Sequence, residues 1–164
     1  MLKRATAAGL AVAMVAVAAT ITRADDKGER AQQTVIVSRT FTMPKGHCSQ
    51  LPADAEVQGL GLERTTTVAT QADGRLAYAR LSTITGTATD NFGGTYTFFY
   101  QNRLDAKAIP GTGLDVDTFQ LTGTGVANGL STFFRAKVRV DSGANPTGFE
   151  IIEQSGDPFT CDPL

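Results

Sequence analysis

The sequence predicts an all-β protein, an antiparallel up-and-down meander of about seven long strands that forms a closed or nearly closed β-barrel. Apolar and polar residues alternate with the two-residue period of strands, and beyond the N-terminal segment no helical period is sustained. Clusters of Gly, Asn, Asp and Pro punctuate the alternating segments. Long strands favour closure, because closure removes exposed edges, and a β-sandwich is the alternative.

Each expected strand is bounded by turn signals. The strands span residues 34–42, 57–71, 75–89, 95–104, 116–126, 130–141 and 148–154. Asp73-Gly74 predicts a tight hairpin, and Asn128-Gly129 predicts another. Residues 109–113 are expected to form a Pro/Gly loop, and residues 142–146 another. Glycines inside the strands fit either the bends of a small barrel or space for a ligand. These glycines are Gly59, Gly61, Gly86, Gly123 and Gly125.

The N-terminus has the features of a signal peptide. Lys3 and Arg4 precede an apolar run over residues 5–19, and small residues suit signal peptidase at either of two places, Ala16-Val17-Ala18 or Thr22-Arg23-Ala24 just before Asp25. That run is shorter than the roughly 20 residues needed to span a bilayer. We therefore expect a signal peptide over residues 1–24, general secretion to the periplasm or the medium, and no membrane span after its removal. A flexible segment over residues 25–33 and a single domain over residues 34–164 should follow.

Charge and residue usage exclude several classes of function. Without Lys3, Arg4 and Arg23 the chain keeps 12 of its 15 basic residues against 16 acidic ones, a net charge near −4 that disfavours nucleic acid as a partner. One His and two Cys cannot build a dense metal site, and no nucleotide-binding or calcium-loop motif is present. We expect neither a cofactor nor a bound metal.

Cys48 and Cys161 are expected to form a disulfide, because an exported chain matures in an oxidising compartment. The bond would tie the C-terminal tail to the loop that follows the first strand. The alternative is a reactive thiol at Cys48 beside His47, the only imidazole available as a general base.

Several charged residues in the expected strands are candidates for catalysis. We expect Asp115 and Asp117 to be solvated at a strand start, and Glu150 and Glu153 to lie on opposite faces of their strand. Glu63 and Arg80 lie within strands and could assist a reaction inside a barrel. The basic set over residues 135–139 fits the solvated face of an amphipathic strand.

Three aromatic residues alternate on one expected strand over residues 96–100, and together with aromatic residues of other strands they are the candidate ligand-binding residues. They could line the mouth of a barrel that holds a small apolar molecule, or they could fill a packed core. The candidates are Tyr78, Tyr96, Phe98, Tyr100, Phe119 and Phe134.

A threonine ladder forms a second candidate surface. Alternate residues share one face of a strand, so the array could meet carbohydrate, another subunit or ice, although threonine is also common on solvated strands. The ladder comprises Thr83, Thr85, Thr87, Thr89, Thr95, Thr97, Thr122 and Thr124.

The glycine-rich segment over residues 85–94, followed by a Thr/aromatic strand, resembles hairpins of secreted β-barrel proteins such as the dirigent and allene oxide cyclase-like group. The sequence favours an exported binding protein without catalytic activity, which holds a small apolar ligand or an extracytoplasmic protein partner. One alternative is a cofactor-free isomerase or cyclase of the kind this resemblance implies. Another is an adhesive or assembly protein that uses the threonine ladder.

Overall fold

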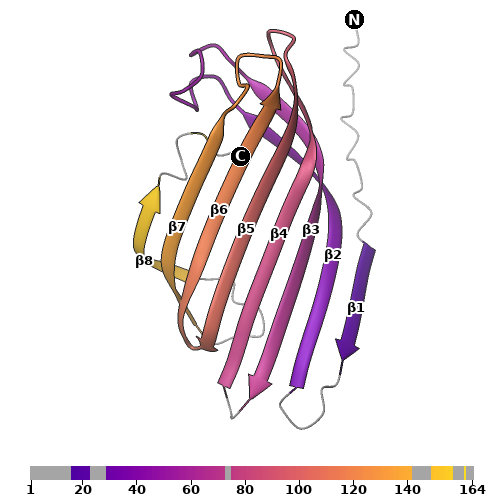
Figure 1. Cartoon of the computed structure of the whole chain (residues 1–164), viewed down its shortest axis with the longest axis vertical. Helices are drawn as coiled ribbons and strands as arrows, with labels where there is room; N and C mark the ends of the chain where they lie inside the picture. Colours follow the sequence, from indigo (N-terminus) through magenta and orange to yellow (C-terminus); the bar gives the residue numbers. More distant parts are fainter. Residues whose placement is uncertain (1–15, 23–28, 73–74, 142–148, 157–160, 162–164) are drawn as a thin grey trace, which may run out of the picture.

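The computed structural model describes residues 16–22, 29–72, 75–141, 149–156 and 161. It is a single antiparallel sheet in which the strand order follows the sequence (Figure 1). The strands are β1 (Ala16–Thr22), β2 (Glu29–Met43), β3 (Val57–Ala72), β4 (Arg75–Asp90), β5 (Thr95–Ile109), β6 (Gly111–Gly123), β7 (Ser131–Val140) and β8 (Phe149–Gly156). The described residues contain no helix.

The prediction of an all-β antiparallel meander is confirmed, and β2 to β8 are the seven strands that the sequence predicts. The sheet is strongly curved (Figure 1) but is not closed into a barrel. Among the described residues, β1 pairs only with β2 and β8 pairs only with β7. A sandwich would need two sheets, whereas all eight strands belong to one.

Several strand boundaries differ from those expected. β2 begins at Glu29, so residues 29–33, expected to be flexible, pair with the far end of β3. β5 and β6 run through residues 109–113, the expected Pro/Gly loop, and only Pro110 separates them. β6 ends at Gly123 and not at Val126. Where a strand begins and ends depends on the residues available for pairing in the neighbouring strand, and local turn propensity contains no information about that pairing.

Two predicted turns, Asp73-Gly74 and residues 142–146, lie outside the described residues. Ala72 and Arg75, on either side of the first of them, pair as neighbours in β3 and β4. The turn over Asn128-Gly129 is present, and Gly129 adopts a φ of 80°, which favours glycine.

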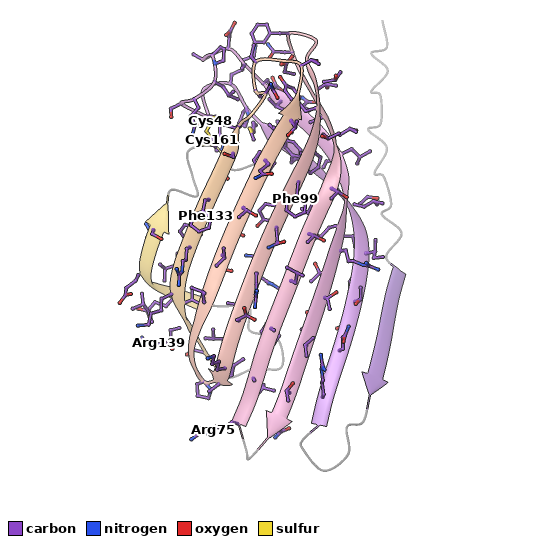
Figure 2. The ribbon with its side chains drawn as sticks, viewed as in Figure 1. Cys48, Arg75, Phe99, Phe133, Arg139 and Cys161 are labelled. Carbon is purple, nitrogen blue, oxygen red and sulfur yellow. A yellow bond between two sulfur atoms is a disulfide. The ribbon has the colours of Figure 1, made fainter. Side chains whose placement is uncertain are left out.

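Alternation divides the sheet into a buried face and an exposed face. In β7 the even-numbered residues from Phe134 to Val140 are buried and the odd-numbered ones are exposed. The pairing register continues this division across the sheet, because Cα partners share a face. The exposed face carries most of the exposed large hydrophobic side chains, including Phe99 and Phe133 (Figure 2).

Curvature builds the core from a single sheet. Phe41 of β2 lies 5.9 Å from Phe119 of β6 between ring centroids, and both contact the ring of Phe98 on β5. These rings belong to one core cluster near the disulfide. A second cluster, around Leu104 and Val138, fills the buried face toward the opposite end. Strands that are distant in sequence therefore bury one another's aromatic side chains.

Glycines in β3 and β4 provide room for the aromatic rings. A Cβ at Gly59 would lie 2.1 Å from the Phe41 ring, and a Cβ at Gly61 or Gly86 would lie 2.7 Å from the Phe98 ring. The space above these glycines is therefore filled by the protein itself and is not ligand space.

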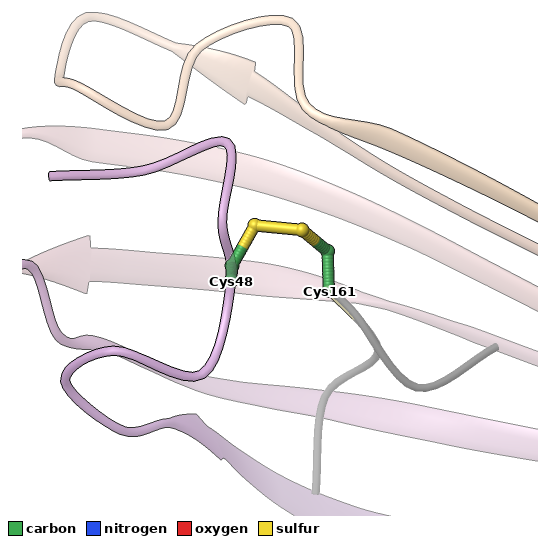
Figure 3. Close-up of a disulfide and its surroundings, with 2 residues drawn as sticks. All are labelled: Cys48 and Cys161. Atoms are coloured by element: carbon green, nitrogen blue, oxygen red, sulfur yellow. A yellow bond between two sulfur atoms is a disulfide. The ribbon is translucent and has the colours of Figure 1, made fainter. Parts of the chain in front are cut away.

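Cys48 and Cys161 form the predicted disulfide, with Cα atoms 4.4 Å apart and 113 residues of sequence separation (Figure 3). Cys48 lies in the loop after β2, and both half-cystines are buried in the first core cluster. The bond joins the chain's C-terminal tail to the end of the sheet at which β2 finishes.

Candidate functional site

All six candidate aromatic residues lie on the buried face. Tyr96, Phe98 and Phe119 belong to the cluster near the disulfide, and Tyr100 packs against it. Tyr78 and Phe134 belong to the second cluster. Except for the half-buried Tyr100, each is at most 8% exposed. Their rings fill the core, so the structure offers no open aromatic mouth among them.

Tyr96 contributes its hydroxyl to a turn. It donates a hydrogen bond to the carboxylate of Asp90 and accepts one from the backbone N–H of Ala127 at 3.0 Å. Burial raises the pKa of Tyr96 to about 12, and the Asp90 hydrogen bond acts in the same direction. This hydroxyl is occupied in joining the β4–β5 turn to the segment between β6 and β7.

Glu63 lies inside the sheet and not in bulk solvent. Its side chain is 14% exposed, and Arg39 Nε donates to its Oε2 at 2.5 Å. Ser82 and Thr65 donate to its Oε1 at 2.5 and 3.1 Å. Burial by itself raises the pKa of Glu63, but the hydrogen bonds from Ser82, Arg39 and Thr65 outweigh burial and lower it. Glu63 is thus a stabilised carboxylate.

A second polar group crosses β4, β5 and β6 on the same face. Arg80 Nη2 donates to Asn102 Oδ1 at 2.9 Å, and Asn102 Nδ2 donates to Oδ1 of both Asp115 and Asp117 at 2.8 Å. Tyr100 donates to Asp117 at 2.9 Å. Within the described residues, Arg80 Nε is buried without a hydrogen-bond partner. Arg80 therefore belongs to the interior, as Glu63 does.

The expectation that Asp115 is a solvated strand-end residue is wrong. Asp115 is only 5% exposed, because β6 begins four residues earlier than Asp115 and carries it into the interior. Burial raises its pKa, the nearby Asp117 carboxylate raises it further, and Asn102 and Arg80 oppose the shift. The two carboxylates share one amide donor, so they form a close acidic pair.

Glu150 and Glu153 lie on the same face of β8, although a strict two-residue alternation predicts opposite faces. A register shift at Lys137/Val138 places Glu153 opposite Lys137 and Glu150 opposite Arg139. Their N···O separations are 3.8 and 2.6 Å. All four side chains are solvent-exposed, so each ion pair contributes at most about 1 kcal/mol.

The threonine ladder lies on the exposed face. In β4, Thr85, Thr87 and Thr89 are exposed and Thr83 is half-buried; Thr95 and Thr97 on β5 and Thr122 on β6 are also exposed. Thr124 lies just beyond β6, and its hydroxyl accepts from the backbone N–H of Thr95 at 3.5 Å.

Two rows of Cα partners on this face contain no charged residue. We call them the threonine face: Thr40, Leu60, Thr87, Thr97 and Thr122 in one row, and Ser38, Leu62, Thr85, Phe99 and Gln120 in the next. Leu60 and Leu62 are 58% and 59% exposed. Neighbouring exposed apolar side chains of this kind are typical of interaction surfaces.

A groove of about 1030 Å³ crosses the exposed face farther from the disulfide, from β3 to β8. Its lining includes the apolar Val68, Ala79 and Leu114, which belong to one register row of the exposed face together with the charged Asp105 and Lys137. Its charged lining residues are Arg103, Asp105, Lys107, Arg135, Lys137 and Glu153. Of the six predicted aromatic residues, only Tyr78 lines it.

The groove is the feature that the sequence prediction missed. The pattern held a partial signal, because Arg103, Asp105 and Lys107 alternate on β5 as Arg135 and Lys137 do on β7. The antiparallel register that sets these two sets on either side of β6 involves residues far apart in the sequence.

The reactive-thiol alternative is contradicted. Cys48 is held in the disulfide, and neither cysteine is free. The neighbouring His47 is half-buried, and its backbone N–H donates to the carbonyl of Pro44 at 3.0 Å. Over the described ranges, no three His, Cys, Asp or Glu side chains gather in an arrangement suited to a metal ion.

Comparison of the chain with protein-family models, with curated proteins and with solved structures finds no match. In the described part of the chain, no helix is long and apolar enough to cross a membrane.

Proposed function

We propose that this chain is an extracytoplasmic binding protein whose ligand site is the groove on the exposed face. The groove is the observation that carries the proposal: its volume of about 1030 Å³ is at the upper end for small-molecule sites, and its lining mixes apolar and charged residues. The dense packing of the buried face supports a site outside the core.

Export is part of the proposal. The N-terminal signal features and the disulfide, which persists in oxidising compartments, both support it. Cleavage after Ala24 would remove β1 and leave β2 as an edge strand. Mass spectrometry of the exported protein should find Asp25 at the N-terminus and a mass two hydrogens below that of the reduced chain. An uncleaved or cytoplasmic product would overturn the export proposal.

Blocking the groove tests the binding proposal. We expect native mass spectrometry of the protein from its host's exported fraction to show a bound small molecule. Ala79→Tyr, in the groove lining, should abolish this species, whereas Thr87→Tyr on the threonine face should retain it. A wild-type protein that is empty and that binds no member of a lipid, sugar and metabolite panel would refute the groove as a ligand site.

A second candidate function is docking to another macromolecule through the threonine face. The exposed Leu60 and Leu62 support it, because their rows of Cα partners carry no charge. If the partner is a second copy, sedimentation velocity should show a concentration-dependent dimer that Leu62→Ser weakens. A monomer at all concentrations would refute the self-association form of this candidate.

A further inference from the structure

The walls of the groove contain more cationic than anionic groups. Its lining holds Arg103, Lys107, Arg135 and Lys137 but only Asp105 and Glu153, so its formal charge is +2. The whole chain has a formal charge of −1. The groove is therefore a positively charged region on a protein whose net charge is negative.

Ion pairing leaves two of these cations available. Arg103 Nε lies 2.5 Å from Asp105, and Lys137 Nζ lies 3.8 Å from Glu153, so both acids have a cationic neighbour. Lys107 and Arg135 make no ion pair with any described residue. Both side chains are exposed and can reorient toward a ligand.

Strand register places cations on both sides of β6. Arg103 on β5 and Arg135 on β7 both pair with Val116, so they flank it on the same face. Strands two apart are separated by roughly 10 Å, which a single carboxylate, sulfate or phosphate group can bridge between two long side chains. The adjoining row runs from Val68 and Ala79 through Asp105 to Leu114, so it brings apolar surface beside this pair on either side of the Asp105 carboxylate, which Arg103 neutralises.

We infer that the groove takes an amphipathic organic anion, with its acidic group held by Arg135, unpaired among the described residues, on the side facing Arg103, and its apolar body on Val68, Ala79 and Leu114. The inference rests on the proposed function, because it names the ligand class of the same groove. It also revises the expectation of a purely apolar ligand, since such a molecule would leave the cationic walls without a counter-charge.

Three probes with the same tail test the inference: decanoate and decyltrimethylammonium, each below its micelle concentration, and decanol below its solubility limit. Isothermal titration calorimetry with the full-length mature protein should give the order decanoate, then decanol, then the cation. Arg135→Gln should weaken decanoate binding about fivefold, as expected for a partly solvated charge contact. It should leave decanol binding unchanged, and added salt should reduce the effect.

Arg139→Gln is the matched control. Arg139 lies on the same face of β7, is exposed and pairs with Glu150, but it does not line the groove. Decanol binding that equals decanoate binding, or an Arg139→Gln effect as large as that of Arg135→Gln, would overturn the inference and leave the groove as a binding site. Failure of all three probes to bind would overturn the inference. If, in addition, native mass spectrometry shows the same bound species for Ala79→Tyr as for the wild type, the groove is overturned as the ligand site as well.

Discussion

Asp90 joins two turns through four hydrogen bonds. Its carboxylate accepts from the backbone N–H groups of Phe92, Gly94 and Val126 at 2.9, 2.7 and 3.3 Å, and from the hydroxyl of Tyr96. Burial raises its pKa, but these hydrogen bonds outweigh burial and lower the pKa below the ordinary value. The ionised form therefore stabilises the folded state.

We expect Asp90→Asn to lower the free energy of unfolding by about 2 kcal/mol at pH 7, the scale of hydrogen bonds to a charged group. Because the folded pKa is depressed, this stability is present above the unfolded pKa, near 4, and is lost as pH falls through the folded value. Urea unfolding between pH 7 and pH 3 should show that the difference in free energy of unfolding between wild type and Asp90→Asn becomes smaller as pH falls. Asp54→Asn, at an exposed loop carboxylate, is the control. A pH-independent difference would contradict the ionic explanation.

Asp115 should behave in the opposite way. Its folded pKa is raised, so the folded state binds the proton more tightly and loses stability as pH rises from about 4 through the folded pKa. Asp115→Asn keeps an oxygen that can accept from Asn102 but carries no charge. We expect the variant to be at least as stable as wild type at pH 7 and to lack this pH dependence in urea unfolding. A large loss at pH 7 would show that the ionised carboxylate is required.

At the level of elements, β8 shows how one register shift changes a surface. A strict two-residue period separates Glu150 and Glu153, whereas the shift opposite Lys137/Val138 brings both to the exposed face. Both then meet cations on β7. A bulge depends on the partner strand and on sheet curvature, so periodicity within β8 could not reveal it.

The glycine–aromatic contacts in β3 and β4 make an element-level prediction. The three atoms nearest a Cβ at Gly59 all belong to the Phe41 ring. Gly59→Ala should destabilise the protein by about 1–3 kcal/mol, because the ring must move. Combined with Phe41→Leu, the same change should cost less than the sum of the two single changes in a double-mutant cycle measured by urea unfolding.

Gly86→Ala is the matched comparison for this cycle. A Cβ at Gly86 would lie 2.2 Å from the backbone carbonyl oxygen of Leu60, which no side-chain truncation removes. We therefore expect Phe98→Leu to reduce the destabilisation caused by Gly86→Ala only slightly. If the phenylalanine truncations reduced the destabilisation equally at both sites, the aromatic ring would not be the reason that position 59 requires glycine.

The disulfide acts on the whole molecule. It closes a loop with 113 residues of sequence separation, and the chain-entropy treatment assigns such a crosslink about 5 kcal/mol. The double variant Cys48→Ser/Cys161→Ser should lose about 2–5 kcal/mol in chemical unfolding and melt at a lower temperature. Reductant should lower the melting temperature of the wild type and leave that of the double variant unchanged. Equal stability of the two proteins would contradict a structural role for the bond.

Local pattern was sufficient for a substantial part of this protein. The all-β class, the seven strands from β2 to β8, the Cys48–Cys161 pairing and the shared face of Tyr96, Phe98 and Tyr100 follow from the period of two and from turn and cysteine chemistry. These properties depend on residues close together in sequence or on the only pairing available to two cysteines.

Only the tertiary structure decided whether the sheet closes, what its buried face contains and where a cavity lies. The curvature that brings Phe41 to Phe119 fills the buried face near the disulfide with aromatic rings, the packed-core alternative of the two that the sequence left open. The extension of β6 buries Asp115, and the register of β5, β6 and β7 sets Arg103 and Arg135 around Val116. Each outcome depends on pairings between residues far apart in the chain, whose register and curvature are set by the packing of the whole sheet.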